Sequence, residues 1–368
     1  VYLLVSFNIA LSLYRYDNSG NSFGWAGLLS TPDAGEPAEI AYTESDKKAL
    51  QYIPPETLQT WRGRDFLVAL GIPSPDNDER RERRFLQRDS CWTYKGVATA
   101  RNKFTGDMIV LYVLAQHPQH DYKYSKELEA EAREWQDVIA LPIHEGRVST
   151  NKKVGEVAHW GIDAEIGMSR KVFLWFDMAF RILPKVSYIS KGDDDAFYHA
   201  PQYVVDMRTL PRQRIYWAFH WRINPKDPFN FGRGLLYTLS RDVAQKFITY
   251  EPIRRLVHVP FTIDRKQEFT SLIMEYEDAM VGRAISRLKI DDLIYVNESC
   301  CRFIILNGGE CKAPQNNDFV VVHGVEGQGY KDLMERFSHY TTPVPVKFVP
   351  FTFGLKASCA IAGENRGR

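Results

Sequence analysis

From about residue 60, short apolar runs alternate with longer amphipathic stretches, and this alternation constrains the fold more than any other feature of the chain. Residues 65–74, 107–115 and 137–141 are apolar runs of strand length, bounded by polar or turn-forming residues. Amphipathic segments of helical length separate them. Strands that alternate with helices are typical of an α/β domain, so we expect a central sheet covered by helices.

Two of the predicted helices have clear ends. Ser125 is placed to cap residues 126–135, a strong helix-forming segment with glutamates in its first turn. A longer apolar-faced helix opens at Asp163 or Ala164 and ends before Pro184. Helices of this kind can cover a sheet face, which agrees with the α/β prediction.

Further strands follow the long helix. A run rich in valine, isoleucine and tyrosine at 185–190 predicts a buried strand, and residues 214–221, 234–240 and 318–325 also predict strands. No internal repeat and no long linker divides residues 60–350, so a single domain is expected there.

The two ends of the chain differ from this domain in composition. Residues 1–16 are apolar as far as Leu13, which is shorter than the roughly 18 residues that cross a bilayer. We expect the remnant of an N-terminal membrane anchor, although a buried helix or strand explains these residues nearly as well. Residues 17–59, rich in Gly, Ser and Pro at their start, are expected to form a stem. Residues 351–368 are expected to form a C-terminal tail.

Charge and cysteine content exclude several classes of protein. The chain has 47 Lys and Arg against 46 Asp and Glu, which gives no general attraction to nucleic acid. Five cysteines are too few for a disulfide scaffold, have no zinc-type spacing and leave at least one thiol free. The Asn297-Glu298-Ser299 sequence is a glycosylation acceptor in a lumenal protein, and gives weak support for such a compartment.

Three adjacent aspartates, Asp193, Asp194 and Asp195, follow the strand predicted at 185–190. Neighbouring carboxylates repel one another unless a cation or a basic group compensates them. If the segment is extended, Asp193 and Asp195 point to one side and Asp194 to the other. Oxygen-rich groups suit Mg²⁺ or Mn²⁺, and the carboxyl end of a strand is where open α/β sheets bind ligands. An ordinary acidic turn is the alternative explanation.

Four other groups carry possible chemistry. The acidic pair Glu277-Asp278 opens an amphipathic helix, where it could equally compensate the helix dipole. Gly232 and Gly234 precede a strand and permit close approach to a ligand or a tight turn. His323 lies in a late strand, where a lone histidine is more often structural than a metal ligand. The arginine-rich helix at 80–92 is either solvated or in contact with phosphate.

The order and spacing of these groups resemble the β-1,3-glycosyltransferase family of inverting galactosyl- and N-acetylglucosaminyltransferases. The family pattern runs from a basic segment through "K-x-DDD-x-F", a glycine-containing "Y-x-x-G-x-G-Y-x-x-S" and "EDV-x-x-G" to a late histidine. The matching positions span roughly residues 60 to 325: Arg80, Arg81, Arg84, Trp92, Lys191, Asp193, Asp194, Asp195, Phe197, Phe231, Gly232, Gly234, Tyr237, Ser240, Glu277, Asp278, Gly282 and His323. Ala279, Phe231 and Leu236 depart from the pattern, and the kinetoplastid-type branch looks most similar.

The resemblance implies a single GT-A domain, which is a Rossmann-like nucleotide-diphospho-sugar transferase fold with a mixed central sheet. It implies transfer of galactose or N-acetylglucosamine from UDP-galactose or UDP-N-acetylglucosamine to a glycan acceptor with β-1,3 linkage. Mn²⁺ or Mg²⁺ would be held by Asp193, Asp195 and His323, and Asp278 would act as the catalytic base. Donor-binding positions fall on Asp193, Asp194, Lys191, Gly232, Gly234, Arg80 and Arg84. The family places such enzymes in the Golgi or endoplasmic reticulum, behind a single N-terminal anchor.

Three other functions fit parts of the pattern. A retaining transferase would share the metal ligands but need no base at Asp278. A metal-dependent nucleotidyltransferase or phosphohydrolase could use the same aspartates. A lumenal glycan-binding protein with a degenerate site would bind glycans without releasing UDP.

Overall fold

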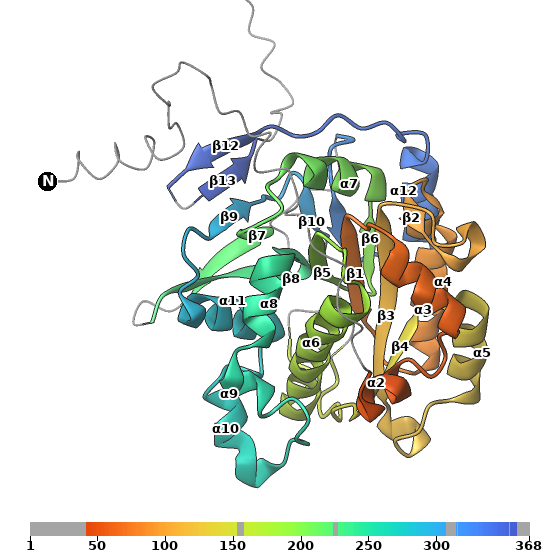
Figure 1. The fold of residues 1–368 in the computed structure, drawn as a ribbon, viewed down its shortest axis with the longest axis vertical. Helices are drawn as coiled ribbons and strands as arrows, with labels where there is room; N and C mark the ends of the chain where they lie inside the picture. The colour runs from red at the N-terminus through yellow and green to blue at the C-terminus, as the bar shows by residue number, and fades with distance from the viewer. Residues whose placement is uncertain are drawn as a thin grey trace, which may run out of the picture. The chain divides into compact units, whose positions relative to one another are not determined.

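The computed structural model describes residues 42–152, 158–223, 227–306, 314, 316–352 and 354–358. These residues belong to one compact unit of mixed α/β architecture (Figure 1). Within the described ranges, a ten-stranded central sheet is accompanied by a separate three-stranded sheet. The predicted α/β class and mixed central sheet are therefore confirmed.

One half of the central sheet is parallel. Its strands are β1 (Val68–Pro73), β2 (Val97–Ala98), β3 (Met108–Gln116), β4 (Val138–His144) and β5 (Tyr188–Gly192). β1 lies between β3 and β5, and β3 pairs with both β2 and β4. Successive residues of these strands are buried on opposite faces, which explains why their sequences read as continuous apolar runs.

The other half of the sheet is mixed. Its strands are β7 (Ile215–Ile223), β8 (Phe229–Ser240), β9 (Ile294–Asn297), β12 (Phe348–Phe351) and β13 (Gly354–Ala357). β8 runs antiparallel to both β5 and β7, and β9 runs parallel to β7 and β13. β8 starts five residues before the predicted strand at 234–240. The β12–β13 hairpin extends this sheet, so the prediction of a tail from residue 351 is wrong for the described residues.

Helices on one face of the sheet bury the larger hydrophobic core. They are α6 (Ile162–Ile182), α8 (Arg241–Ile248) and α11 (Glu277–Leu288), together with the short helices α9 (Glu251–Arg254) and α10 (Lys266–Thr270). α6 lies along the sheet near β1 and β5 (Figure 1). Trp175 on α6 packs directly over Gly71 of β1, where an added Cβ would lie 2.1 Å from the indole ring. Gly71 thus allows α6 to approach the sheet.

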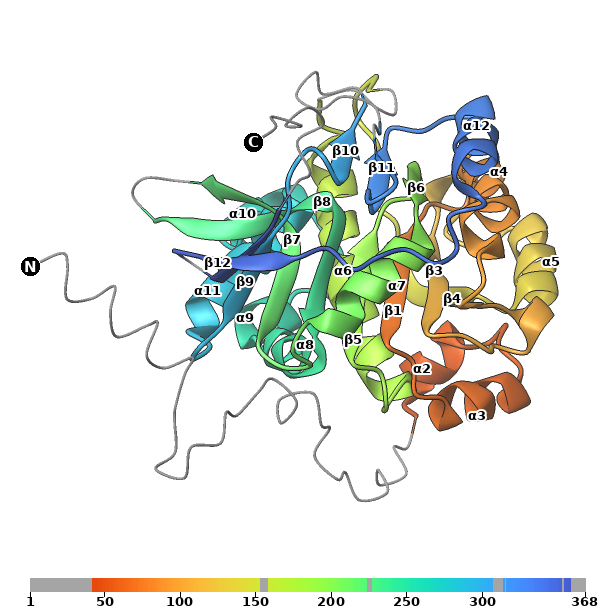
Figure 2. The same ribbon diagram turned by 90° about the horizontal axis from the view of Figure 1, so that it is seen from above.

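The opposite face is covered by helices and by the small sheet. The helices are α4 (Asp78–Asp89), α5 (Lys126–Trp135), α7 (Ala200–Thr209) and α12 (Gln328–Phe337), and the small sheet contains β6 (Ala196–Tyr198), β10 (Phe303–Ile305) and β11 (Val321–His323). Ser125 caps α5 by accepting a hydrogen bond from the Leu128 amide, as predicted. β11 is shorter than the strand predicted at 318–325. Figure 2 shows β6, β10 and β11 grouped beside α12.

The N-terminal boundary of the folded unit lies earlier than predicted. α2 (Glu44–Ala49) falls within the expected stem and α3 (Pro55–Gly63) starts in it, but Ala49 and Ile53 of this stretch are buried in the core, as is Trp61 on α3. Residues 42–59 are therefore part of the globular unit. The predicted anchor at 1–16 and the rest of the stem lie outside the described residues. Among those that are described, no helix combines the length and the apolar character needed to cross a bilayer.

Candidate functional site

The three aspartates occupy the turn between β5 and β6, at the carboxyl end of a central strand. Asp194 is turned into the protein, where its carboxylate accepts hydrogen bonds from the Ser74 hydroxyl at 2.7 Å and from Arg80 Nη1 at 2.6 Å. Ser74 directly follows β1, so the ends of β1 and β5 meet here. Asp193 and Asp195 instead lie together beside His323. The three residues form a turn and not the extended segment on which the predicted alternation depended.

Asp193, Asp195 and His323 form a cluster with the donor atoms of a cation site. His323 Nε2 lies 3.3 Å from Asp193 Oδ2 and 3.2 Å from Asp195 Oδ1, and one ligand atom from each residue lies within 4.8 Å of the others. β11 pairs antiparallel to β6 with His323 opposite Ala196, which places the histidine beside the aspartates. Two carboxylates and an imidazole fit a Mn²⁺ site, and carboxylates alone would suit Mg²⁺ equally.

The charges within this cluster compensate one another. Burial works against a charged imidazole, but the adjacent carboxylates of Asp195 and Asp193 raise the pKa of His323 to about 10. Burial also opposes ionisation of Asp193 and Asp195, yet Lys191 and His323 hold the pKa of Asp193 below its usual value, and His323 does so for Asp195. The imidazolium therefore supplies the positive charge that the neighbouring carboxylates require.

Backbone hydrogen bonds hold the aspartate turn in place. The Asp195 carbonyl accepts from the amides of Gly324 and Val325, both at 2.9 Å. The Gln87 side chain on α4 donates to the carbonyls of Asp193 at 3.1 Å and Ala196 at 2.8 Å. Gln87 was not among the residues predicted from the sequence. Its position one helical turn from Arg83 and Arg84 was the available signal.

Lys191 connects the aspartates to the acidic pair that begins α11. It is 2% exposed, and its Nζ lies 2.6 Å from Asp193 Oδ1, 3.0 Å from Glu277 Oε2 and 2.7 Å from the Gly234 carbonyl oxygen. The second Glu277 oxygen accepts a hydrogen bond from the Tyr237 hydroxyl. Both Glu277 oxygens are therefore engaged inside the protein.

Asp278 lies at the same site but in a different environment. Its Oδ2 accepts from the Gly234 amide at 3.1 Å and its Oδ1 from the Ala279 amide at 2.8 Å, and its side chain is only partly buried. Burial raises the pKa of Asp278, and Lys191 opposes this shift. For Glu277, burial raises the pKa to about 7, again against the effect of Lys191. Each Asp278 oxygen keeps a lone pair beyond its backbone bond, so this carboxylate can still accept a proton.

The glycines of the family pattern have different positions. Gly234 contacts the charged groups directly, since a Cβ there would lie 3.4 Å from Lys191 Nζ and 3.8 Å from Asp278 Oδ2. Gly232 is a packing position, where a Cβ would lie 2.3 Å from Cβ of Ala218. Gly282 similarly permits α11 to approach β8, because its Cβ would lie 2.4 Å from Cβ of Phe231. The structure thus brings only Gly234 to the acidic residues.

The arginines of α4 are mostly buried, so the solvated-helix explanation is wrong. Arg84 makes a buried ion pair with Glu131 at 2.7 Å and donates to Ser74 Oγ at 3.0 Å. Arg80 pairs with Asp194, as described above. Arg83, which the sequence analysis did not identify, lies 3.8 Å from Asp195 Oδ2. Helical spacing could have shown that Arg80, Arg83, Arg84 and Gln87 share one side of α4.

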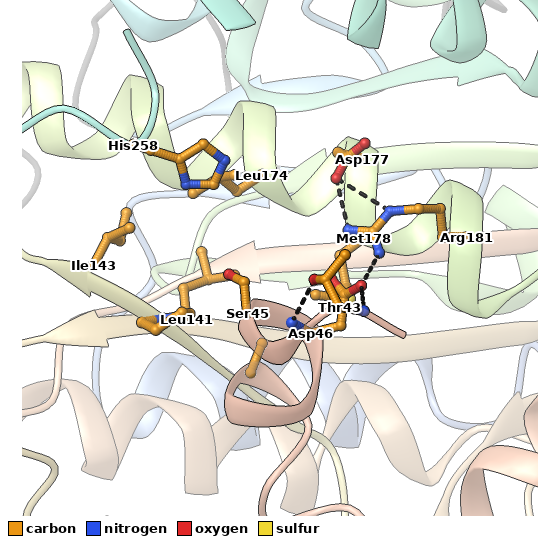
Figure 3. Close-up of a pocket in the computed structure, with 12 residues that line it drawn as sticks. Thr43, Ser45, Asp46, Leu141, Ile143, Leu174, Asp177, Met178, Arg181 and His258 are labelled. Atoms are coloured by element: carbon orange, nitrogen blue, oxygen red, sulfur yellow. Dashed lines mark hydrogen bonds and ion pairs between the residues drawn. The ribbon is translucent and has the colours of Figure 1, made fainter. Parts of the chain in front are cut away.

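A cavity of about 280 Å³ lies elsewhere, between α2, β4 and α6 (Figure 3). Its lining includes Leu141, Met178 and His258 but none of the acidic cluster. Arg181 extends along this cavity, and its guanidinium pairs with Asp46 at 2.5 Å and Asp177 at 2.7 Å. These charges are already compensated, so the cavity offers less chemistry than the end of β5.

The cysteines are consistent with a partly oxidised protein. Cys91 is a buried free thiol, in agreement with the predicted unpaired cysteine. Cys300 and Cys301 are both disulfide-bonded.

No protein-family model matches this chain, and a search of curated proteins returned no match. The resemblance to glycosyltransferases rests on the residues quoted above.

Proposed function

We propose that this protein is an inverting, metal-dependent glycosyltransferase of GT-A type, which moves galactose or N-acetylglucosamine from a UDP-sugar to a hydroxyl of a glycan with β-1,3 linkage. The observation that carries the proposal is the convergence of Asp193, Asp195 and His323 at the end of β5, with Asp278 joined to them through Lys191 and Gly234. A cation site and a separate carboxylate are the two groups that such a transfer requires.

Asp193, Asp195 and His323 would hold the cation. The carboxylate oxygens suit Mn²⁺, and so does the imidazole nitrogen of His323 once it has lost its proton. The cation would then replace the positive charge that a protonated His323 places beside Asp193 and Asp195. A bound divalent cation would neutralise the charge that develops on the diphosphate leaving group. Asp194 would instead hold the turn, because Ser74 and Arg80 already occupy its carboxylate.

Asp278 is the best candidate for the catalytic base. It would accept the proton of the acceptor hydroxyl, whose oxygen forms a bond to the anomeric carbon while the bond from that carbon to the diphosphate breaks and its electron pair leaves with UDP. Burial raises the pKa of Asp278, which strengthens it as a base. Glu277 is less suitable, since Lys191 and Tyr237 bond both of its oxygens.

We further propose that the protein acts in the lumen of the Golgi or endoplasmic reticulum. The disulfide-bonded state of Cys300 and Cys301 supports an oxidising compartment. An N-terminal anchor remains part of this proposal.

The function is tested by incubating the protein with a panel of UDP-sugars, Mn²⁺ and simple glycoside acceptors, and by measuring UDP release. We expect acceptor-dependent UDP release and, by NMR, a product of inverted anomeric configuration. Asp278→Asn should reduce the rate by about 10²- to 10⁴-fold, while Glu277→Gln should retain more activity. Release of pyrophosphate or phosphate instead, a retained configuration, or normal turnover by Asp278→Asn would contradict the assignment.

A further inference from the structure

Arg83 combines deep burial with weak bonding. The whole residue is only 7% exposed. Its Nη2 nevertheless makes only long contacts, at 3.4 Å to Glu79 Oε1 and 3.5 Å to Glu326 Oε1, and both of these carboxylates are largely exposed. Its Nη1 lies 3.8 Å from Asp195 Oδ2 and finds no hydrogen-bond partner within the described part of the chain. Arg84, one residue away, makes ion-pair contacts of 2.7 Å.

This state requires an explanation, because a buried guanidinium without short hydrogen bonds loses its hydration and gains little in return. Two explanations fit the position of Arg83. It could orient the Asp195 carboxylate, or it could supply donors to an anion bound beside that carboxylate. The distance of 3.8 Å is too long for a hydrogen bond to Asp195, which favours the second explanation.

The surrounding charges restrict which anion can bind beside Arg83. Asp193 and Asp195 repel a free anion, so any anion near Arg83 has to arrive with a cation or bind to one. Phosphate groups meet this condition, since Mg²⁺ and Mn²⁺ bind the phosphates of a substrate together with one or two carboxylates. The planar guanidinium of arginine is well matched to phosphate oxygens.

We propose that Arg83 binds the phosphate of a nucleoside diphosphate that lies next to the cation held by Asp193, Asp195 and His323. The inference rests on the proposed function and extends it: Arg83 makes the site selective for a diphosphate over a monophosphate. Arg80 and Arg84 do not take this role, because Asp194 and Glu131 hold their guanidinium groups at short distances.

Calorimetric titration of the full chain tests this role with three probes in the presence of Mn²⁺: UDP, UMP and inorganic pyrophosphate. We expect Arg83→Gln to weaken binding of UDP and pyrophosphate by about 10- to 100-fold, the range for loss of a charged hydrogen bond, and to leave UMP binding nearly unchanged. Arg83→Lys should recover part of the loss. Arg133→Gln is the matched control, because Arg133 is exposed and, among the described residues, its ion pair is with the neighbouring Glu129 on α5.

Mn²⁺ affinity, measured by electron paramagnetic resonance without nucleotide, separates the two explanations. An anion-binding Arg83 predicts equal or tighter Mn²⁺ binding in Arg83→Gln, since a nearby positive charge has been removed. Weaker Mn²⁺ binding in that variant, or an equal loss for UMP and UDP, would overturn the proposal in favour of an orienting role.

The proposed function and this inference can fail separately. If the wild type binds pyrophosphate but not UDP, and Arg83→Gln loses pyrophosphate, the role of Arg83 in diphosphate binding stands, whereas the uridine nucleotide and the glycosyltransferase proposal are contradicted. If UDP and pyrophosphate bind equally to wild type and Arg83→Gln, only the inference is overturned. If the wild type binds neither probe, both are overturned.

Discussion

Replacement of Lys191 by methionine removes the group that joins the two acidic parts of the site. Lys191 Nζ contacts Asp193, Glu277 and the Gly234 carbonyl, all within 3.0 Å, in a position that is 2% exposed. Removal of one partner from a buried ion pair typically costs about 3–5 kcal/mol of unfolding free energy. Methionine has a similar length and adds no polar atom, so the loss reports mainly the charge and its hydrogen bonds.

Protonation of Glu277 limits this loss and makes it dependent on pH. Burial already raises the pKa of Glu277 to about 7, and removal of Lys191 would raise that pKa further because Lys191 lowers it. When folding raises the pKa of a carboxyl group, the protein becomes more stable as the pH falls from the folded-state pKa toward the pKa of the unfolded chain. We therefore expect Lys191→Met to lower the free energy of unfolding by about 3 kcal/mol at pH 8 and by less at pH 6.

Urea unfolding of Lys191→Met, Glu277→Gln and the double variant measures these effects. The loss of unfolding free energy in the double variant should be about 1–3 kcal/mol smaller than the sum of the losses in the two single variants, because the double variant has no unpaired Glu277 charge. A loss under about 1 kcal/mol for Lys191→Met at pH 8, or additive losses in the double variant, would refute the reasoning.

Two other substitutions test the packing and titration of buried groups. Gly71→Ala should lower the free energy of unfolding in urea by about 1–3 kcal/mol or more, because the added Cβ would lie 2.1 Å from the Trp175 ring. Gly63→Ala is the control and should change this free energy little, because a Cβ at Gly63 would meet no neighbouring atom within 4 Å. Equal effects of the two substitutions would argue against close packing of α6 on the sheet. Burial lowers the pKa of His220 from 6.5 to about 3 in the folded protein. As the pH falls below 6.5, the unfolded chain takes up a proton at His220 and the folded protein does not, so the folded protein loses stability. Between pH 7.5 and pH 5 the wild type should therefore lose about 2 kcal/mol relative to His220→Gln in urea unfolding, and parallel pH profiles would contradict the shift.

Local pattern predicted the elements that lie in the buried parallel half of the sheet. β1, β3, β4 and β5 are apolar runs whose length alone distinguishes them from helices, and α5 carries its own cap at Ser125. The edges were harder to predict. Residues 42–59 look like a stem because Gly, Ser and Pro precede them, yet they contain α2 and the start of α3, and Ala49 and Ile53 are buried against the core.

The candidate site shows the same division between local and distant information. The expected separation of Asp194 from Asp193 and Asp195 is observed, but a turn produces it and not the extended segment that was assumed. The partners of the arginines could not be read locally, because Glu131, the partner of Arg84, lies 47 positions further along the chain. Likewise, His323 reaches the aspartates through the pairing of β11 with β6, which depends on tertiary structure.

The central claim is that Asp193, Asp195 and His323 hold a divalent cation which in turn binds a nucleoside diphosphate. Its most direct test is calorimetric titration of UDP into the wild type and Asp195→Asn, with Mn²⁺ and then with EDTA. We expect UDP to bind the wild type only when Mn²⁺ is present, and Asp195→Asn to lose that binding. Equal UDP binding in EDTA, or unchanged Mn²⁺-dependent binding by Asp195→Asn, would contradict the claim.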